Sequence, residues 1–176
     1  MKRLLFIFSI TIAVLALASC TAEPDFSNVP MLLDGSTTLT KYANIRDRLG
    51  NAQDSLVIGV KFQDGDGDLG LSPGTYPQDS IQFNNGFNYE VRTFRRIRGQ
   101  FQDVSASFGV SNSGNFPRLR TDNKVGPIEG TLQRAIMVPY GAVTRNDTLK
   151  FMIRIRDRGM NVSNEVETPS VVVRAQ

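Results

Sequence analysis

The sequence predicts an all-β fold, built as a sandwich of two antiparallel sheets. Apolar and polar residues alternate in several short runs, and no segment after residue 28 repeats with the period of an amphipathic helix. Asp-Gly, Pro-Gly, Asn-Gly and Arg-Gly pairs separate these runs, and such pairs favour turns. Many short strands joined by turns of this kind are typical of a β-sandwich.

Three runs carry the clearest strand pattern. Leu56–Phe62 places four apolar side chains on one face, and Phe87–Arg92 alternates in the same way. In Leu149–Arg156 the apolar side chains are expected to point inward, and the basic ones to point to water. Each run therefore predicts a strand with one buried face.

The remaining strands are less marked. The weaker candidates are Val29–Leu33, Leu132–Val138 and Val171–Arg174. Residues 100–127 are rich in Ser, Asn and Gly, so we expect a long loop there with at most one short strand.

The first twenty residues have the composition of an export signal. Lys2 and Arg3 precede an apolar stretch that runs from Leu4 to about Leu17, which fits a secretory signal and is too short to span a bilayer as a helix. The stretch ends in Leu-Ala-Ser-Cys, which resembles the lipobox of bacterial lipoproteins. Cys20 is the one cysteine of the chain, so it has no internal disulfide partner. We therefore expect residues 1–19 to be removed and Cys20 to carry lipid; the alternative is an ordinary signal peptide.

The rest of the chain then divides into two parts. Residues 20–28 are expected to be the lipidated cysteine and a polar tether, and residues 29–176 a single domain. Loss of Lys2 and Arg3 removes most of the net charge of +3, so the basic balance does not indicate nucleic-acid binding. The expected partner is the lipid bilayer. An Asp directly after the lipidated cysteine is associated with retention in the inner membrane. This chain has Thr21 there, so we expect the protein to be anchored in the outer membrane.

The residue inventory excludes several kinds of enzyme. The chain has no histidine, which excludes histidine-based triads and His-ligated zinc. A cysteine nucleophile is excluded if Cys20 carries lipid. Paired carboxylates remain available, but the acidic residues gather in one short loop. The absence of tryptophan, which often forms flat platforms for sugars, makes a carbohydrate-binding function less favoured. The sequence therefore predicts a protein without catalytic residues.

Residues 64–70 form the most chemically distinctive segment, Asp-Gly-Asp-Gly-Asp-Leu-Gly. Asp64, Asp66 and Asp68 can converge if the backbone curls, which the glycines permit. Three adjacent negative charges repel, and a hard cation with oxygen ligands relieves this repulsion. The loop is not an EF-hand, since it lacks the glycine and the final glutamate of that motif. The alternative is a pair of Asp-Gly turns at the end of a hairpin.

Several segments together resemble a family of uncharacterised Bacteroidetes lipoproteins. They are Asp54 through the acidic loop, Ile128-Glu129-Gly130, Asn146–Leu149, Asp157-Arg158 and Ser163–Pro169. The resemblance implies an immunoglobulin-like sandwich on a lipid anchor and brings no established activity. Residues 157–163 are also similar to the last hairpin of bacterial immunoglobulin-like domains, except that Met160 lies between Gly159 and Asn161.

An immunoglobulin-like fold would bring two remote loops together. If Leu56–Phe62 and Leu149–Arg156 are the second and sixth strands, their ends lie at the same tip of the sandwich. Asp157 and the side-chain carbonyl of Asn161 would then complete the oxygen shell begun by the three aspartates. Hard oxygen ligands favour Ca²⁺, in a structural role. The alternative is that Asp157 forms a turn with its own backbone and no ion binds.

Two further patterns have competing interpretations. The basic residues between Val91 and Arg98 form either a solvated sheet face, which we favour, or a site for an acidic ligand. Ser55, Ser80 and Thr148 each follow Asp and precede an aliphatic residue, which resembles the O-glycosylation signal of Bacteroidetes. The same pattern is also an ordinary strand entry.

The expected function is binding or structural support by a lipid-anchored protein of the cell envelope. The partner would be an envelope protein or a glycan. The first alternative is an accessory subunit that captures glycans or peptides for an outer-membrane uptake system. The second is a hydrolase that uses the metal of the acidic loop.

Overall fold

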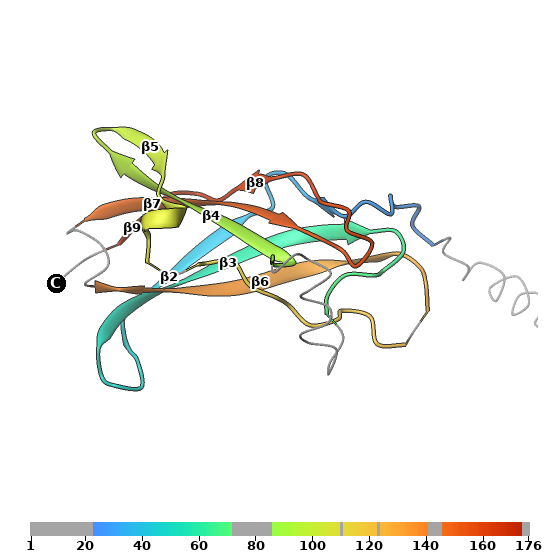
Figure 1. Ribbon diagram of the computed structural model, residues 1–176, viewed down its shortest axis with the longest axis horizontal. Coiled ribbons are helices and arrows are strands. Elements are labelled where there is room, and N and C mark those ends of the chain that lie inside the picture. Colours follow the sequence, from blue (N-terminus) through green and yellow to red (C-terminus); the bar gives the residue numbers. More distant parts are fainter. Residues whose placement is uncertain (1–22, 72–85, 110, 123, 141–145, 174–176) are drawn as a thin grey trace, which may run out of the picture.

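The computed structural model describes residues 23–71, 86–109, 111–122, 124–140 and 146–173. These residues form two antiparallel sheets that pack face to face (Figure 1). The first sheet contains β1 (Met31–Leu32), β2 (Thr38–Arg46), β3 (Ala52–Asp64) and β6 (Ile128–Pro139). The second contains β4 (Tyr89–Ile97), β5 (Gln100–Asp103), β7 (Asp147–Ile155), β8 (Val166–Glu167) and β9 (Val171–Val173). The predicted all-β sandwich is confirmed.

Strand β3 is the centre of the first sheet. On one side it pairs with β6 over nearly its whole length, from Gln53 opposite Pro139 to Asp64 opposite Ile128. On the other side it pairs with β2 and then with β1, which together form an interrupted edge.

Strand β7 has the same position in the second sheet. It pairs with β4 on one side and with the two short strands β8 and β9 on the other. Strand β5 continues the sheet beyond β4 through a tight turn at Arg98 and Gly99. Both turn residues have positive φ, 51° and 85°, as this kind of hairpin turn requires.

The connectivity is that of an immunoglobulin-like sandwich. In the first sheet, β1 and β2 together correspond to strand A, β3 to B and β6 to E. In the second sheet, β4 corresponds to C, β5 to C′, β7 to F, and β8 with β9 to G. Among the described residues between β5 and β6, no strand corresponds to D; the one regular element there is a short 3-10 helix, Ser105–Ser107. Strands β3 and β7 thus correspond to B and F, the second and sixth strands of the immunoglobulin fold, and they lie in opposite sheets.

The core lies between the two sheets, where the alternating faces meet. The inward residues of β3 and β7 are all buried, as predicted: Leu56, Ile58, Val60, Phe62, Leu149, Phe151, Ile153 and Ile155. Tyr89 and Val91 of β4 join them. Alternation along the sequence therefore identified the buried faces of three strands.

Three elements differ from the sequence prediction. Strand β2 was not predicted, because its residues are mostly exposed and it lies at an edge. Strand β6 starts four residues before the predicted Leu132, and β1 covers only two of the residues between Val29 and Leu33. Within the described residues, no helix is both long and apolar enough to cross a bilayer.

Candidate metal centre

The acidic loop and the turn after β7 meet at one tip of the sandwich. Strand β3 ends at Asp64 and β7 ends at Ile155, and the two strands run toward the same end of the molecule (Figure 1). A bridge between Leu69 and Asp157 joins the two connections. The guanidinium of Arg158 also donates to the carbonyl of Gly70 at 3.1 Å. The predicted meeting of these remote segments is therefore present.

Glycines let neighbouring segments approach the acidic loop closely. Gly67 has φ of 70°, and a Cβ there would lie 2.6 Å from the carbonyl oxygen of Gly126. The N–H of Gly65 donates to the carbonyl of Ser27 at 2.8 Å. The loop is consequently enclosed by the chain before β1 and the chain before β6.

Three carboxylates converge inside this tip. Asp64, Asp68 and Asp157 each offer an oxygen, and these oxygens lie within 4.8 Å of one another. Asp64 and Asp157 are 0% exposed, and Asp68 is half-buried. An acidic cluster that could hold a metal ion is therefore present, built from both sheets.

The hydrogen bonds of the three carboxylates differ. Asp157 accepts from the backbone N–H of Asn161 at 2.7 Å and from its side-chain Nδ2 at 2.8 Å. Asp68 Oδ2 accepts from the N–H of Gly159 at 2.9 Å. Both oxygens of Asp64 and Oδ1 of Asp68 are buried and accept no well-formed hydrogen bond from the described residues. A buried carboxylate without such bonds costs free energy unless a cation or a proton neutralises it.

The electrostatics show the same uncompensated charge. Burial raises the pKa of Asp64 to about 7, and the negative charges of Asp66, Asp68 and Asp157 add to the rise. Burial also raises the pKa of Asp68 and that of Asp157. For Asp68, the hydrogen bond from the N–H of Gly159 and the positive charge of Arg158 offset part of this rise in pKa. Among the described residues, the negative charge around Asp64 is therefore only partly compensated.

Asp66 and Asn161, the other two predicted ligands, make hydrogen bonds within the two loops. Asp66 Oδ1 accepts from the N–H of Asp68 at 3.3 Å, and its backbone carbonyl accepts from Gly126 at 3.2 Å. The sequence predicts that Asn161 offers its side-chain carbonyl to the ion. Its Nδ2 donates to Asp157 and so orients that carboxylate, which leaves the side-chain carbonyl as a predicted ligand.

Two observations bear on the competing interpretations of these loops. The acidic loop is not a hairpin end, because β3 and β4 lie in different sheets. Asp157 does form the expected turn with its own backbone through Asn161. That turn does not explain the buried oxygens of Asp64, which lack a well-formed hydrogen bond from the described residues.

The other predicted site residues are those of the lipidation and glycosylation predictions. Cys20 and Ser80 are outside the described residues. Ser55 lies in the central strand β3, where it is 6% exposed between its cross-strand neighbours Tyr42 and Met137. Thr148 is half-buried in β7 opposite Val172. A glycan on Ser55 would have to displace its neighbours in the folded sheet.

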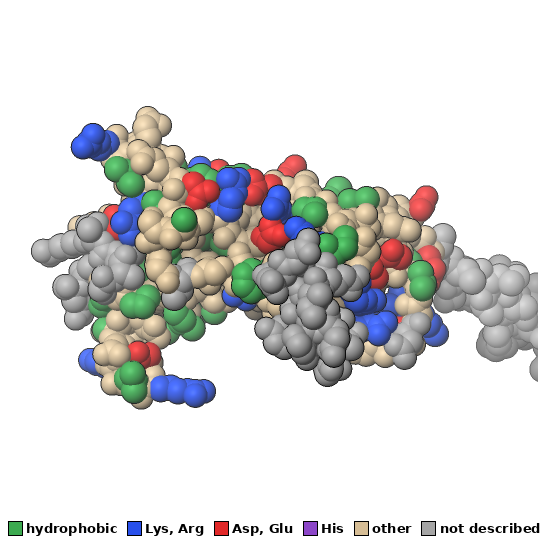
Figure 2. Space-filling model, in the orientation of Figure 1, with side chains coloured by type: hydrophobic (Ala, Val, Ile, Leu, Met, Phe, Trp, Pro, Cys, Tyr) green, Lys and Arg blue, Asp and Glu red, His purple; other side chains and the backbone are tan. Residues whose placement is uncertain are grey.

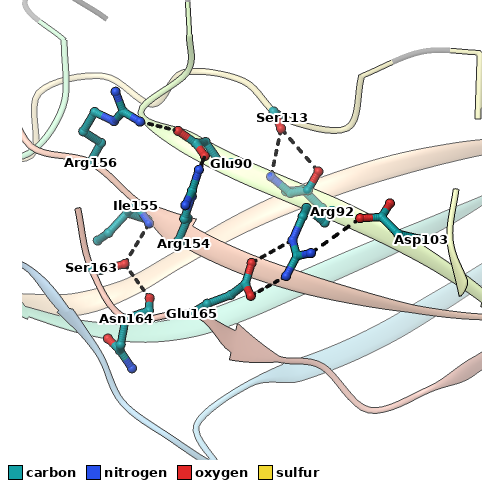
Figure 3. Close-up of polar contacts among 11 residues, drawn as sticks. Glu90, Arg92, Asp103, Ser113, Arg154, Ile155, Arg156, Ser163, Asn164 and Glu165 are labelled. Atoms are coloured by element: carbon teal, nitrogen blue, oxygen red, sulfur yellow. Dashed lines mark hydrogen bonds and ion pairs between the residues drawn. The ribbon is translucent and has the colours of Figure 1, made fainter. Parts of the chain in front are cut away.

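Arg92 of β4, Arg154 of β7 and the adjacent Arg156 form ion pairs on the second sheet (Figure 3). Arg92 pairs with Glu165 through two nitrogens, at 3.0 and 2.5 Å, and also contacts Asp103. Glu90 pairs with both Arg154 and Arg156. Figure 2 shows acidic and basic side chains mixed along this edge of the molecule. The arrangement fits the interpretation as a solvated sheet face.

Comparison of the chain with protein-family models, with curated proteins and with solved structures finds no match.

Proposed function

We propose that the chain is a non-catalytic lipoprotein of the bacterial envelope, whose immunoglobulin-like domain is locked at its tip by a Ca²⁺ ion. Cys20 anchors it to the outer membrane. Its role is binding or structural support, and the ion is structural.

One observation carries the metal proposal. The carboxylate of Asp64 is fully buried, accepts no well-formed hydrogen bond from the described residues, and faces Asp68 and Asp157. Folding brings these charges together from two sheets, so the fold itself creates a buried charge that a cation can neutralise. An ion that binds only the folded chain stabilises it by mass action.

The ligands select the kind of ion. All three are hard carboxylate oxygens, and the chain has no histidine to favour zinc. Ca²⁺ binds oxygens at about 2.3–2.6 Å, so two oxygens of one shell can be about 5 Å apart. The spacing of the cluster lies within that limit. Asp66, whose negative charge also raises the pKa of Asp64, and Asn161 would extend the shell.

The enclosure of the site supports a structural ion over a catalytic one. A catalytic metal needs an open position for water or substrate. Here Asp64 and Asp157 are 0% exposed, and neighbouring segments close over the loop. An ion held there ties β3 to β7 and thereby joins the two sheets at the tip.

Thermal unfolding of the protein in Ca²⁺ and in chelator tests the proposal. Ca²⁺ should raise the unfolding midpoint of the wild type. At a hundred times the dissociation constant, the bound ion adds about 2.7 kcal/mol to the free energy of unfolding. Asp64→Asn should abolish the Ca²⁺ response, whereas Asp34→Asn, at an exposed turn residue, should leave it intact. A wild-type midpoint that ignores Ca²⁺ would refute the ion.

A further inference from the structure

We infer that the tip with the acidic loop is a membrane-docking surface, which lies against phospholipid headgroups while the rest of the sandwich stands away from the bilayer. The inference rests on the proposed anchor at Cys20 and goes beyond it. The anchor alone would leave the domain free to tumble, whereas docking fixes one end to the lipid surface.

The chain enters the domain at this tip. Ser27 is bound to Gly65 through its carbonyl, so the segment expected to be a tether is already part of the domain there. The described chain begins at Glu23, at the same end of the molecule as the acidic loop (Figure 1). Two residues separate Glu23 from Cys20, so the Cα atoms of Glu23 and Cys20 are at most about 11 Å apart. The tip therefore cannot move far from the headgroups.

Exposed apolar side chains surround the acidic loop. Three segments bind its backbone, at Ser27, Leu119 and Gly126. Each brings an exposed apolar residue: Val29 is 47% exposed, Leu119 is 37% exposed and Val125 is 84% exposed. Apolar side chains in such positions favour contact with the interface of a bilayer.

The charges at the tip are mixed, since Glu23 and Asp25 are exposed there whereas Asp64 and Asp157 are not. The carboxylates of Asp64 and Asp157 are turned inward and buried, so they do not face the headgroups. Asp122 is paired with Arg120 at 2.8 Å. Lys124, next to Val125, is exposed and can reach lipid phosphates.

The opposite end offers a matched control. Leu49 lies in the turn between β2 and β3 and is 87% exposed, nearly the same as Val125. The length of β3 separates that turn from the acidic loop, which is about 40 Å at 3.3 Å per residue. A domain that stands on its tip keeps Leu49 far from the bilayer.

Depth-dependent quenching in vesicles tests the proposal. Val125→Cys and Leu49→Cys each add one thiol to a chain whose single native cysteine, Cys20, is blocked by lipid in the mature protein. The lipidated proteins carry a fluorophore at the new thiol and are reconstituted in Ca²⁺ into vesicles of phosphatidylethanolamine and phosphatidylglycerol. Some of the lipids bear a nitroxide at the headgroup. We expect quenching at position 125 to be at least about twofold stronger than at position 49, given their separation.

Two results would overturn the proposal, and they differ from each other. Equal quenching at both positions in proteins that float with the vesicles would refute docking and leave the anchor intact. A wild-type protein that accepts the fluorophore at Cys20 and does not float would refute the anchor, and with it the docking that rests on it.

Discussion

Asp64 makes the metal-free protein sensitive to pH. Its pKa is near 3.8 in an unfolded chain and rises to about 7 in the folded one, so the folded state holds more protons between these values. The stabilising proton is fully present at low pH and is lost as the pH rises through 7. In chelator, the free energy of unfolding should therefore fall between pH 5 and pH 7, by up to about 1.4 kcal/mol per pH unit.

Urea unfolding of chelated protein at several pH values measures this effect. Asp64→Asn cannot lose a proton, so its stability should fall less over the same interval and should exceed that of the wild type at pH 8. Equal slopes in wild type and variant would show that Asp64 does not hold the extra proton.

At the scale of elements, the acidic loop depends on close backbone contacts. Gly67→Ala would place a methyl group 2.6 Å from the carbonyl of Gly126 and also strain a φ of 70°. We expect a loss of about 1–3 kcal/mol in stability together with weaker Ca²⁺ binding, because the loop must shift. Calorimetric titration with Ca²⁺ and thermal melts measure both effects.

Gly35→Ala separates strain from contact. Gly35 has the same φ of 70°, but no atom lies within 4 Å of the position that the new methyl group would take. This variant should lose only the part of the stability that comes from strain and should keep the Ca²⁺ affinity of the wild type. Identical behaviour of the two variants would mean that the contact with Gly126 has no role.

The elements also differ in how far the sequence could predict them. Strands β3 and β7 each bury an apolar face, and the alternation of apolar residues along the sequence made these inward faces predictable. Strand β2 has no buried residue, since its edge position leaves it with a partner on one side only. Propensity alone does not mark such a strand; its pairing with β3 creates it.

At the scale of the whole molecule, the proposed anchor would determine where the domain works. Cys20→Ser removes the thiol that would carry the lipid, so we expect an unprocessed precursor or a species that no longer partitions into detergent. Phase partitioning and intact-mass measurement of the envelope fraction follow this change. Normal partitioning of the variant would refute lipidation at Cys20.

The sequence by itself determined the all-β class, the inward faces of the main strands and the residue types of the candidate metal site. These follow from local patterns: alternation of period two, turn residues and a short run of carboxylates. Tertiary structure decided which oxygens face each other. The buried isolation of Asp64, the meeting of Asp68 with Gly159 and the use of Asn161 to orient Asp157 all depend on two loops from opposite sheets. Burial and hydrogen bonding across such distances in the chain are properties of packing, which no local pattern encodes.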